Sequence, residues 1–130
     1  QNKKLLVMLC DINRLKYIND NFGHNQGDIA IKAAAKAVRS VCESTMMCFR
    51  IGGDEFIIID TADYEPEQLN KIKNDIQGNM AESEKSIDHK YPLNVSVGIF
   101  YDMVDKFNGI EGPISVADKE MFSEKEKSKR

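Results

Sequence analysis

The stretch MMCFRIGGDEFIIID, residues 46–60, decides the fold. Two strand-like runs, Met46–Ile51 and Glu55–Asp60, flank Gly52-Gly53-Asp54. We predict a hairpin turn at these glycines, because glycine accepts the positive φ that tight turns require. The turn leads directly into a pair of adjacent carboxylates. An antiparallel hairpin with an acidic turn is therefore the expected centre of the molecule.

The segments before the hairpin predict one strand and two helices. Leu5–Ile12 is a continuous apolar run, typical of a strand buried on both faces. A short helix is expected over Arg14–Asn21, followed by a loop over Phe22–Gly27, which contains two glycines. A longer helix is expected from Asp28 to about Cys42, because small apolar residues recur there at helical spacing.

The segments after the hairpin predict a helix, a strand and a helix. Pro66 opens the first helix, and a polar loop is expected over Glu82–Lys90. Asn94–Tyr101 alternates as a strand does, and a last helix starts near Gly112-Pro113. The order β, α, α, β, β, α, β, α favours an α+β fold, with a ferredoxin-like antiparallel sheet flanked by helices.

Length and composition describe one ordinary globular domain over residues 1–130. The chain has 18 basic and 21 acidic residues, for a net charge of −3, which argues against a general nucleic-acid binder. Its longest apolar run, Leu5–Cys10, is far too short to span a bilayer, so we expect no membrane contact by this segment. The expected location is the reducing cytoplasm, and a membrane anchor elsewhere in a parent protein is compatible with it. Cys10, Cys42 and Cys48 are an odd number and lack C-x-x-C spacing, so free thiols are expected.

Three carboxylates are candidates for a metal site. Asp11 ends the first predicted strand and precedes a helix start, where backbone amides suit anionic oxygens. If the hairpin lies beside that strand, Asp11, Asp54 and Glu55 form an all-oxygen site, which prefers Mg²⁺ or Mn²⁺. Taken singly, Asp11 is as well explained as a helix cap and the glycines as an ordinary turn.

Three motifs together resemble the GGDEF family of diguanylate cyclases. The signature lies in residues 50–56, an upstream motif runs from Asp11 to Asp28, and a C-terminal helix motif runs from Ala117 to Lys125. The resemblance implies a palm-like fold, similar to nucleotidyl cyclases. It also implies that two GTP molecules, one held by each protomer of a homodimer, condense to cyclic di-GMP and two pyrophosphates.

The resemblance also implies roles for individual residues. Asp11 and the carbonyl of Ile12 would hold the metal, with Asp54 and Glu55 completing the site and one of that pair helping to ionise the attacking hydroxyl. Gly52 and Gly53 would let the nucleotide lie against the turn, and Asn19 and Asp28 would hydrogen-bond the guanine edge. The remaining substrate-binding candidates are Leu15, Lys16, Lys125 and Lys129. Lys16 is equally well explained as a side chain lying along its helix. Lys125 matches the family lysine that contacts the triphosphate, and the resemblance favours that role over a solvated helix charge.

The sequence departs from the family pattern at several positions. Asn13 stands where many relatives have a second Asp, and Lys129 stands where an arginine usually binds phosphate. Glu43 and Met46 replace the Arg-x-x-Asp pattern of the inhibitory product site, so we expect that site to be absent. The segments that usually flank the family domain are missing, which predicts a piece of a longer protein with an upstream sensory or dimerising domain. A non-catalytic GTP-binding regulatory module is the alternative function.

Overall fold

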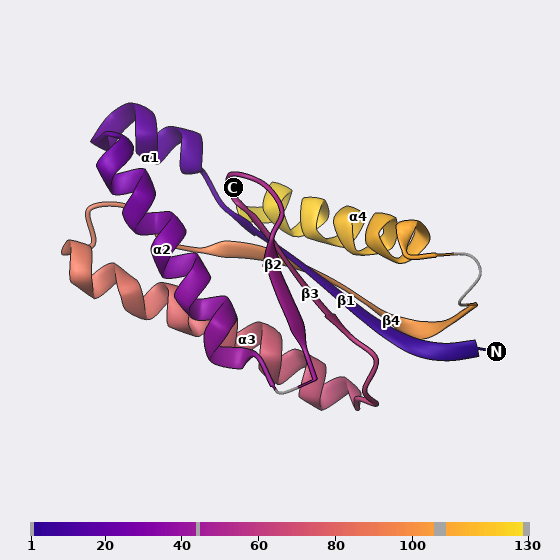
Figure 1. The fold of residues 1–130 in the computed structure, drawn as a ribbon. Coiled ribbons are helices and arrows are strands. Elements are labelled where there is room, and N and C mark those ends of the chain that lie inside the picture. Colours follow the sequence, from indigo (N-terminus) through magenta and orange to yellow (C-terminus); the bar gives the residue numbers. More distant parts are fainter. Residues whose placement is uncertain (1, 44, 106–108, 129–130) are drawn as a thin grey trace.

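The computed structural model describes residues 2–43, 45–105 and 109–128 (Figure 1). It contains four strands and four α-helices in the predicted order, plus one short 3₁₀ helix. The elements are β1 (Asn2–Ile12), α1 (Leu15–Phe22), α2 (His24–Val41), β2 (Met47–Arg50), β3 (Glu55–Asp60), α3 (Pro66–Glu82), η1 (Ser83–Ile87), β4 (Val95–Asp105) and α4 (Glu111–Ser128). The predicted α+β class is confirmed.

The four strands form one antiparallel sheet in the order β2-β3-β1-β4. β1 is central, since it bonds to β3 on one side and to β4 on the other. The hairpin of β2 and β3 forms as expected and lies beside β1. This is the strand order of a ferredoxin-like split β-α-β sheet.

The alternation of side chains along β1 divides the core into two layers. Its even-numbered residues, such as Met8 and Cys10, pack with α2 and α3 on one face. Its odd-numbered residues Val7 and Leu9 pack with Ala117 and Met121 of α4 on the other face. Figure 1 shows α2 and α3 on one side of the sheet and α4 on the other. Asp11 is odd-numbered, so it shares the α4 face.

Two predicted loops contain helical structure. α2 begins at His24 rather than Asp28, because a single left-handed residue, Gly23 at φ 93°, makes the whole turn between α1 and α2. The Gly23 amide donates to Asn19 O, and the Gly23 carbonyl accepts from the amides of Gln26 and Gly27. The polar stretch 82–90 contains η1, which buries Ile87 in the core.

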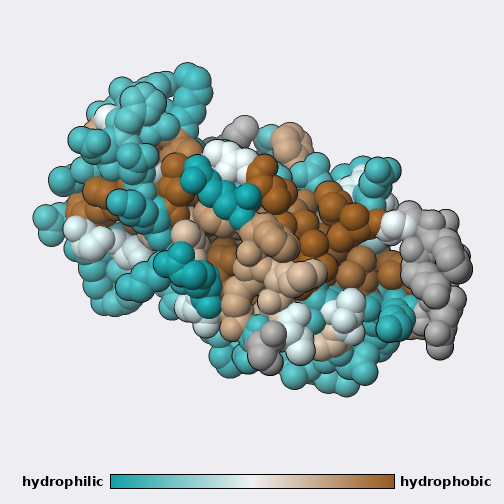
Figure 2. All heavy atoms as spheres, viewed as in Figure 1, coloured by the Kyte–Doolittle hydropathy of each residue, from teal (hydrophilic) through white to brown (hydrophobic). Residues whose placement is uncertain are grey.

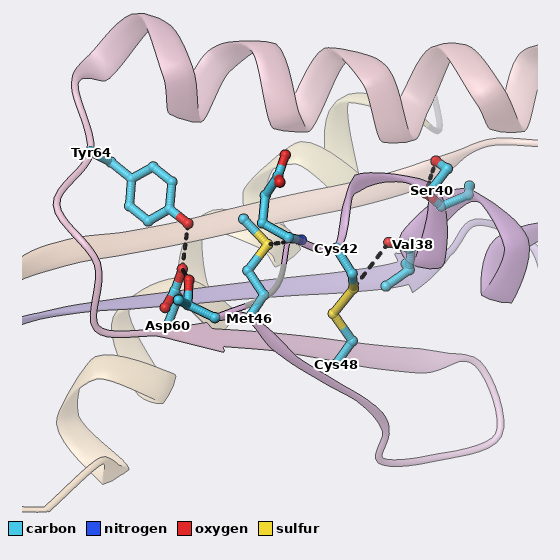
Figure 3. The surroundings of a disulfide bond; sticks show 10 residues. Val38, Ser40, Cys42, Met46, Cys48, Asp60 and Tyr64 are labelled. Atoms are coloured by element: carbon cyan, nitrogen blue, oxygen red, sulfur yellow. Dashed lines mark hydrogen bonds between the residues drawn. A yellow bond between two sulfur atoms is a disulfide. The ribbon is translucent and has the colours of Figure 1, made fainter.

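The expectation of three free thiols is wrong for two of them. Cys42 and Cys48 form a disulfide that ties the end of α2 to β2 (Figure 3). Their separation of six residues gave no C-x-x-C signal, and only the fold brings the end of α2 next to β2. Cys10 is a buried free thiol, as expected.

One part of the sheet carries exposed apolar side chains. Met47, Phe49 and Ile51 are each about half exposed, at 50–53%. Met47 and Phe49 alternate along β2, and Ile51 follows directly after its end, so the spacing places all three on one side. Figure 2 shows an apolar patch in this central region of the molecule. In the part of the chain that the structure describes, no helix is long and apolar enough to cross a membrane.

Candidate functional site

The sheet brings two of the predicted acidic segments together. Asp11 pairs directly with Glu55 in the register between β1 and β3. The Ile12 amide also donates to Asp54 O at 2.9 Å, so the acidic turn is attached to the end of β1. Because paired residues on neighbouring strands face the same side of a sheet, both carboxylates lie on the α4 face.

Arg50 fixes the acidic turn from inside the hairpin. Its Nε donates to Gly52 O at 3.0 Å and its Nη2 donates to Gly53 O at 2.8 Å. Neither glycine adopts a positive φ, so the expected reason for having glycine here is wrong. A Cβ built on Gly53 meets no atom within 4 Å. No contact within the described residues requires a glycine at that position, which leaves its backbone open to a ligand.

Lys125 reaches from α4 to the end of β1. Its Nζ donates to Ile12 O at 2.9 Å and to Asn13 Oδ1 at 3.0 Å, and it lies 3.5 Å from Asp11 Oδ1. Its side chain is 22% exposed and that of Asp11 only 13% exposed. Lys125 is therefore held against the carboxylates and is not a solvated helix charge.

Asn13 is committed to contacts within the protein. It is 4% exposed, and its Oδ1 also accepts a bond from Ser96 Oγ at 2.8 Å. Its Nδ2 donates to Asn94 Oδ1 at 2.6 Å. The amide thus joins β1 and β4 to Lys125. The sequence flagged Asn13 only as a departure from the family pattern and did not indicate Asn94 or Ser96.

The acidic cluster raises the pKa values of its own members. Burial raises the pKa of Asp11 to about 7, with further increases from Asp54 and Glu55, while the Lys125 ammonium acts to lower it. Burial also raises the pKa of Glu55, with the Asp118 and Asp54 carboxylates adding to the effect. Asp118 was not among the predicted site residues, although its position in the C-terminal motif, Ala117 to Lys125, could have indicated that it lies near the site.

These residues fit a divalent cation. Asp11 Oδ1 is buried and has no hydrogen-bond partner among the described residues. A cation there would satisfy this atom and offset the crowding of negative charge, and oxygen donors suit Mg²⁺ or Mn²⁺. Within the described ranges, no three acidic, histidine or cysteine side chains are already gathered in a metal-binding arrangement.

The proposed guanine contacts lie on the first two helices. Asn19 is half-buried on α1, and a Cβ on Gly27 would lie 1.7 Å from Asn19 Oδ1. Gly27 therefore makes room for the Asn19 side chain and holds it near the start of α2. Asp28 follows immediately and is exposed. The structure thus brings Asn19 close to the turn of α2 that carries Asp28.

The other predicted site residues have varied surroundings. Leu15 packs partly buried against the core, while Lys16 is exposed and forms a 2.9 Å ion pair with Asp20 one turn along α1. Lys129 lies outside the described residues. Glu43 and Met46 are the residues that replace the inhibitory motif. Met46 is buried (Figure 3), and its Sδ lies 3.5 Å from the Glu43 amide nitrogen.

Comparison with known sequences gives a match over the whole chain. A sequence model of the family described as "Diguanylate cyclase, GGDEF domain" matches residues 1–130. Signaling protein YkoW of Bacillus subtilis (strain 168) is 37% identical over 125 residues, which are 95% of this chain and 16% of YkoW. Diguanylate cyclase DosC of Escherichia coli (strain K12) is 29% identical over 128 residues, which are 96% of this chain and 27% of DosC. The chain therefore spans less than a third of either relative.

Solved structures share the fold. The active GGEEF domain of a diguanylate cyclase from Vibrio cholerae superposes with a TM-score of 0.75 at 25% identity, covering 93% of this chain and 76% of that chain. Diguanylate cyclase SiaD from Pseudomonas aeruginosa, solved with its activator SiaC, gives a TM-score of 0.78 at 17% identity. That match covers 96% of this chain and 47% of SiaD, and at this identity it shows the fold alone.

Proposed function

Because the chain belongs to the GGDEF domain family of diguanylate cyclases, we propose that it condenses two GTP molecules into cyclic di-GMP and two pyrophosphates. The observation that carries this proposal is the pairing of Asp11 with Glu55 across β1 and β3. The bond between the Ile12 amide and Asp54 O adds the third carboxylate-bearing residue to the same corner. A metal-assisted cyclase needs such a cluster of carboxylates, here called the acidic corner and made of Asp11, Asp54 and Glu55. A purely structural domain has no need of it.

The residues that would hold the metal are Asp11, the Ile12 carbonyl, Asp54 and Glu55. When bound, Mg²⁺ or Mn²⁺ would neutralise charge on the transferring phosphate and favour ionisation of the attacking hydroxyl. One of Asp54 and Glu55 would also accept the proton of the 3′-hydroxyl. In the metal-free protein, burial raises the pKa of Glu55, and the Asp118 and Asp54 carboxylates add to the effect. The open backbone at Gly53 gives the triphosphate room to lie against the turn.

Substrate choice would depend on α1 and α2. The amide of Asn19 and the carboxylate of Asp28 match the acceptor O6 and the donors N1 and N2 of guanine. A family subgroup that makes mixed cyclic GMP-AMP carries a different residue at the position of Asp28. The presence of Asp28 in this chain therefore favours cyclic di-GMP as the product.

A homodimer is part of the proposal. Each protomer would hold one GTP, and two protomers would face each other so that each 3′-hydroxyl attacks the α-phosphorus of the other nucleotide. The chain covers 16% of YkoW and 27% of DosC, which leaves room in such proteins for an upstream sensory or dimerising module. We place the reaction in the cytoplasm, where GTP is available.

One observation favours the alternative of a GTP-binding regulatory module without turnover. Asn13, where many relatives have a carboxylate, is buried, and its Oδ1 already accepts bonds from Ser96 and Lys125. The site therefore has no further acidic metal ligand at this position. Such a module would bind GTP through the same corner and signal to its parent protein.

The test is a forced dimer, made by fusing the domain to a parallel coiled coil and incubating it with GTP and Mg²⁺. Chromatography should resolve cyclic di-GMP, with none formed by the same fusion carrying Glu55→Ala. Glu67→Ala, a change at an exposed carboxylate in the first turn of α3, is the matched control and should keep full activity. GTP binding without any product would replace the proposal by the regulatory alternative.

A further inference from the structure

The Lys125 ammonium occupies the place where a cation is expected. Its distances of 2.9 Å to Ile12 O and 3.5 Å to Asp11 Oδ1 join it to the two groups of β1 that would bind the metal. Asp11 Oδ1 is the buried atom without a hydrogen-bond partner, so the nearby ammonium is its compensating charge. The corner already contains a positive charge before any metal binds.

Lys125 is held there by several elements. Its backbone belongs to α4, which packs closely on β4, since a Cβ on Gly98 would lie 1.8 Å from Ala117 O. Asn13 Oδ1 accepts the ammonium at 3.0 Å and is fixed in turn by Ser96 Oγ. Ile12 O and Asn13 Oδ1, which accept hydrogen bonds from the Lys125 ammonium, are neutral oxygens. Uncharged oxygen acceptors hold an ammonium less strongly than a second carboxylate would.

A divalent cation and Lys125 cannot share these ligands at low cost. A metal bound to Ile12 O and Asp11 would lie within a few ångströms of Nζ, and charges of +2 and +1 repel strongly at such a distance when partly shielded from water. A Lys side chain has four methylene groups and can move its ammonium several ångströms without moving its helix.

We propose that Lys125 is a tethered cation that competes with the metal for the end of β1 and is displaced when the metal binds. Displacement would release the ammonium toward the triphosphate, so that metal entry and phosphate contact become coupled steps. Asn13 acts as a positioning residue, because it holds the ammonium without adding a charge that would resist its release. This inference rests on the proposed metal-dependent function of the same corner.

The test measures Mn²⁺ binding to the chain without nucleotide, by counting free Mn²⁺ in electron paramagnetic resonance titrations at pH 8.5. Lys125→Met should bind Mn²⁺ more tightly than the parent, on the order of tenfold, because the competing charge is gone. Lys125→Arg keeps the charge and should show a much smaller gain. Lys119→Met removes an exposed lysine of the same helix and should match the parent.

A second pair of measurements locates the gain. Asp11→Asn added to Lys125→Met should abolish the extra Mn²⁺ affinity, since the gain depends on that carboxylate. Binding of a non-hydrolysable GTP analogue with Mn²⁺ should weaken in Lys125→Met, the opposite direction to Mn²⁺ alone. Lys125→Gln, which retains a donor for Ile12 O, serves if circular dichroism shows that the methionine variant does not fold.

The outcomes separate this inference from the proposed function. Equal or weaker Mn²⁺ binding by folded Lys125→Met, or by Lys125→Gln in its place, overturns the competition, whatever the cyclase activity is. A gain in Mn²⁺ affinity supports it even if the forced dimer makes no cyclic di-GMP. Failure of that dimer to bind or convert GTP counts only against the proposed function.

Discussion

At Asp11, ionisation is costly in the folded protein because burial and the neighbouring carboxylates outweigh the attraction of Lys125. A carboxyl whose pKa rises on folding, here to about 7, binds more protons in the native state than in the unfolded state between about pH 4 and 7. Its contribution to stability is therefore favourable at low pH and is lost as the pH rises through this window.

Asp11→Asn should consequently stabilise the metal-free chain at pH 8, because the buried charge is removed. We expect the midpoint of thermal unfolding in EDTA to rise on the order of 5 °C at pH 8 and to be nearly unchanged at pH 4. Asp63→Asn, at an exposed carboxylate, is the control. A variant that melts below the parent at pH 8 would contradict the unfavourable ionisation.

At Gly53, a substitution should affect nucleotide binding without affecting the stability of the fold. A Cβ at this position meets nothing within 4 Å, and the backbone has no positive φ. Gly53→Ala should therefore change the free energy of unfolding by less than about 0.5 kcal/mol. It should weaken GTP binding at least tenfold if the nucleotide lies against the turn, which a titration with a non-hydrolysable analogue would measure. Unchanged affinity would place the nucleotide elsewhere.

Individual residues were predictable where a motif names them and not where packing assigns their partners. Asp11, Asp54 and Glu55 could be picked from the sequence, and the register of β1 and β3 brings Asp11 and Glu55 together. The contact between Lys125 and Ile12 O joins residues from opposite ends of the chain, and it depends on how α4 packs. No local pattern contains that information.

Among the elements, α4 is the one whose packing depth sets the site. It approaches β4 so closely that a Cβ on Gly98 would lie 1.8 Å from Ala117 O and 2.5 Å from Met121 N, and both of those atoms are backbone. Backbone atoms cannot rotate away as a side chain can, so α4 as a whole would have to move away from β4.

Gly98→Ala should therefore destabilise the chain by about 3 kcal/mol, the upper part of the range for overpacked cores. Gly78→Ala is the matched control on α3, where a Cβ meets nothing, and it should stabilise by about 1 kcal/mol through helix propensity. Urea unfolding measures both. Equal effects of the two substitutions would show that α4 tolerates displacement.

The disulfide ties two elements that meet only in the fold. Closing so short a loop, between Cys42 and Cys48, should stabilise the chain by about 2 kcal/mol through the entropy of the unfolded state. Reduction should lower the free energy of unfolding by that amount, and the double change to Ser should remove the sensitivity to reductant. Mass spectrometry under native conditions checks the bond itself. Free thiols at Cys42 and Cys48 would contradict it.

Element types were predictable because the periodicities of this chain are clear, while several boundaries were not. The start of α2 moved because one left-handed residue, Gly23, can make a complete turn between helices. The stretch 82–90 has the composition of a loop, yet Ile87 is buried and organises η1. In both cases a single tertiary contact or dihedral outweighs the average character of the segment.

At the scale of the whole molecule, β1 joins the earliest part of the chain to one of the latest. Ile12 pairs with Val95 and Lys3 with Val104, so its pairing with β4 spans most of the sequence. The same strand separates the two core layers, and Asp11 lies at its end. The order of elements predicts this sheet, because split β-α-β units place the first strand between the third and the fourth.

That central strand has a consequence for how the chain folds. Closing such long loops costs entropy before any native contact compensates for it, so folding should take milliseconds to seconds rather than microseconds. Stopped-flow refolding from urea measures the rate, and a microsecond phase that completes the native signal would contradict the expectation. On a ribosome, β1 emerges early but has no strand to pair with on its β4 side until almost the whole domain has been made.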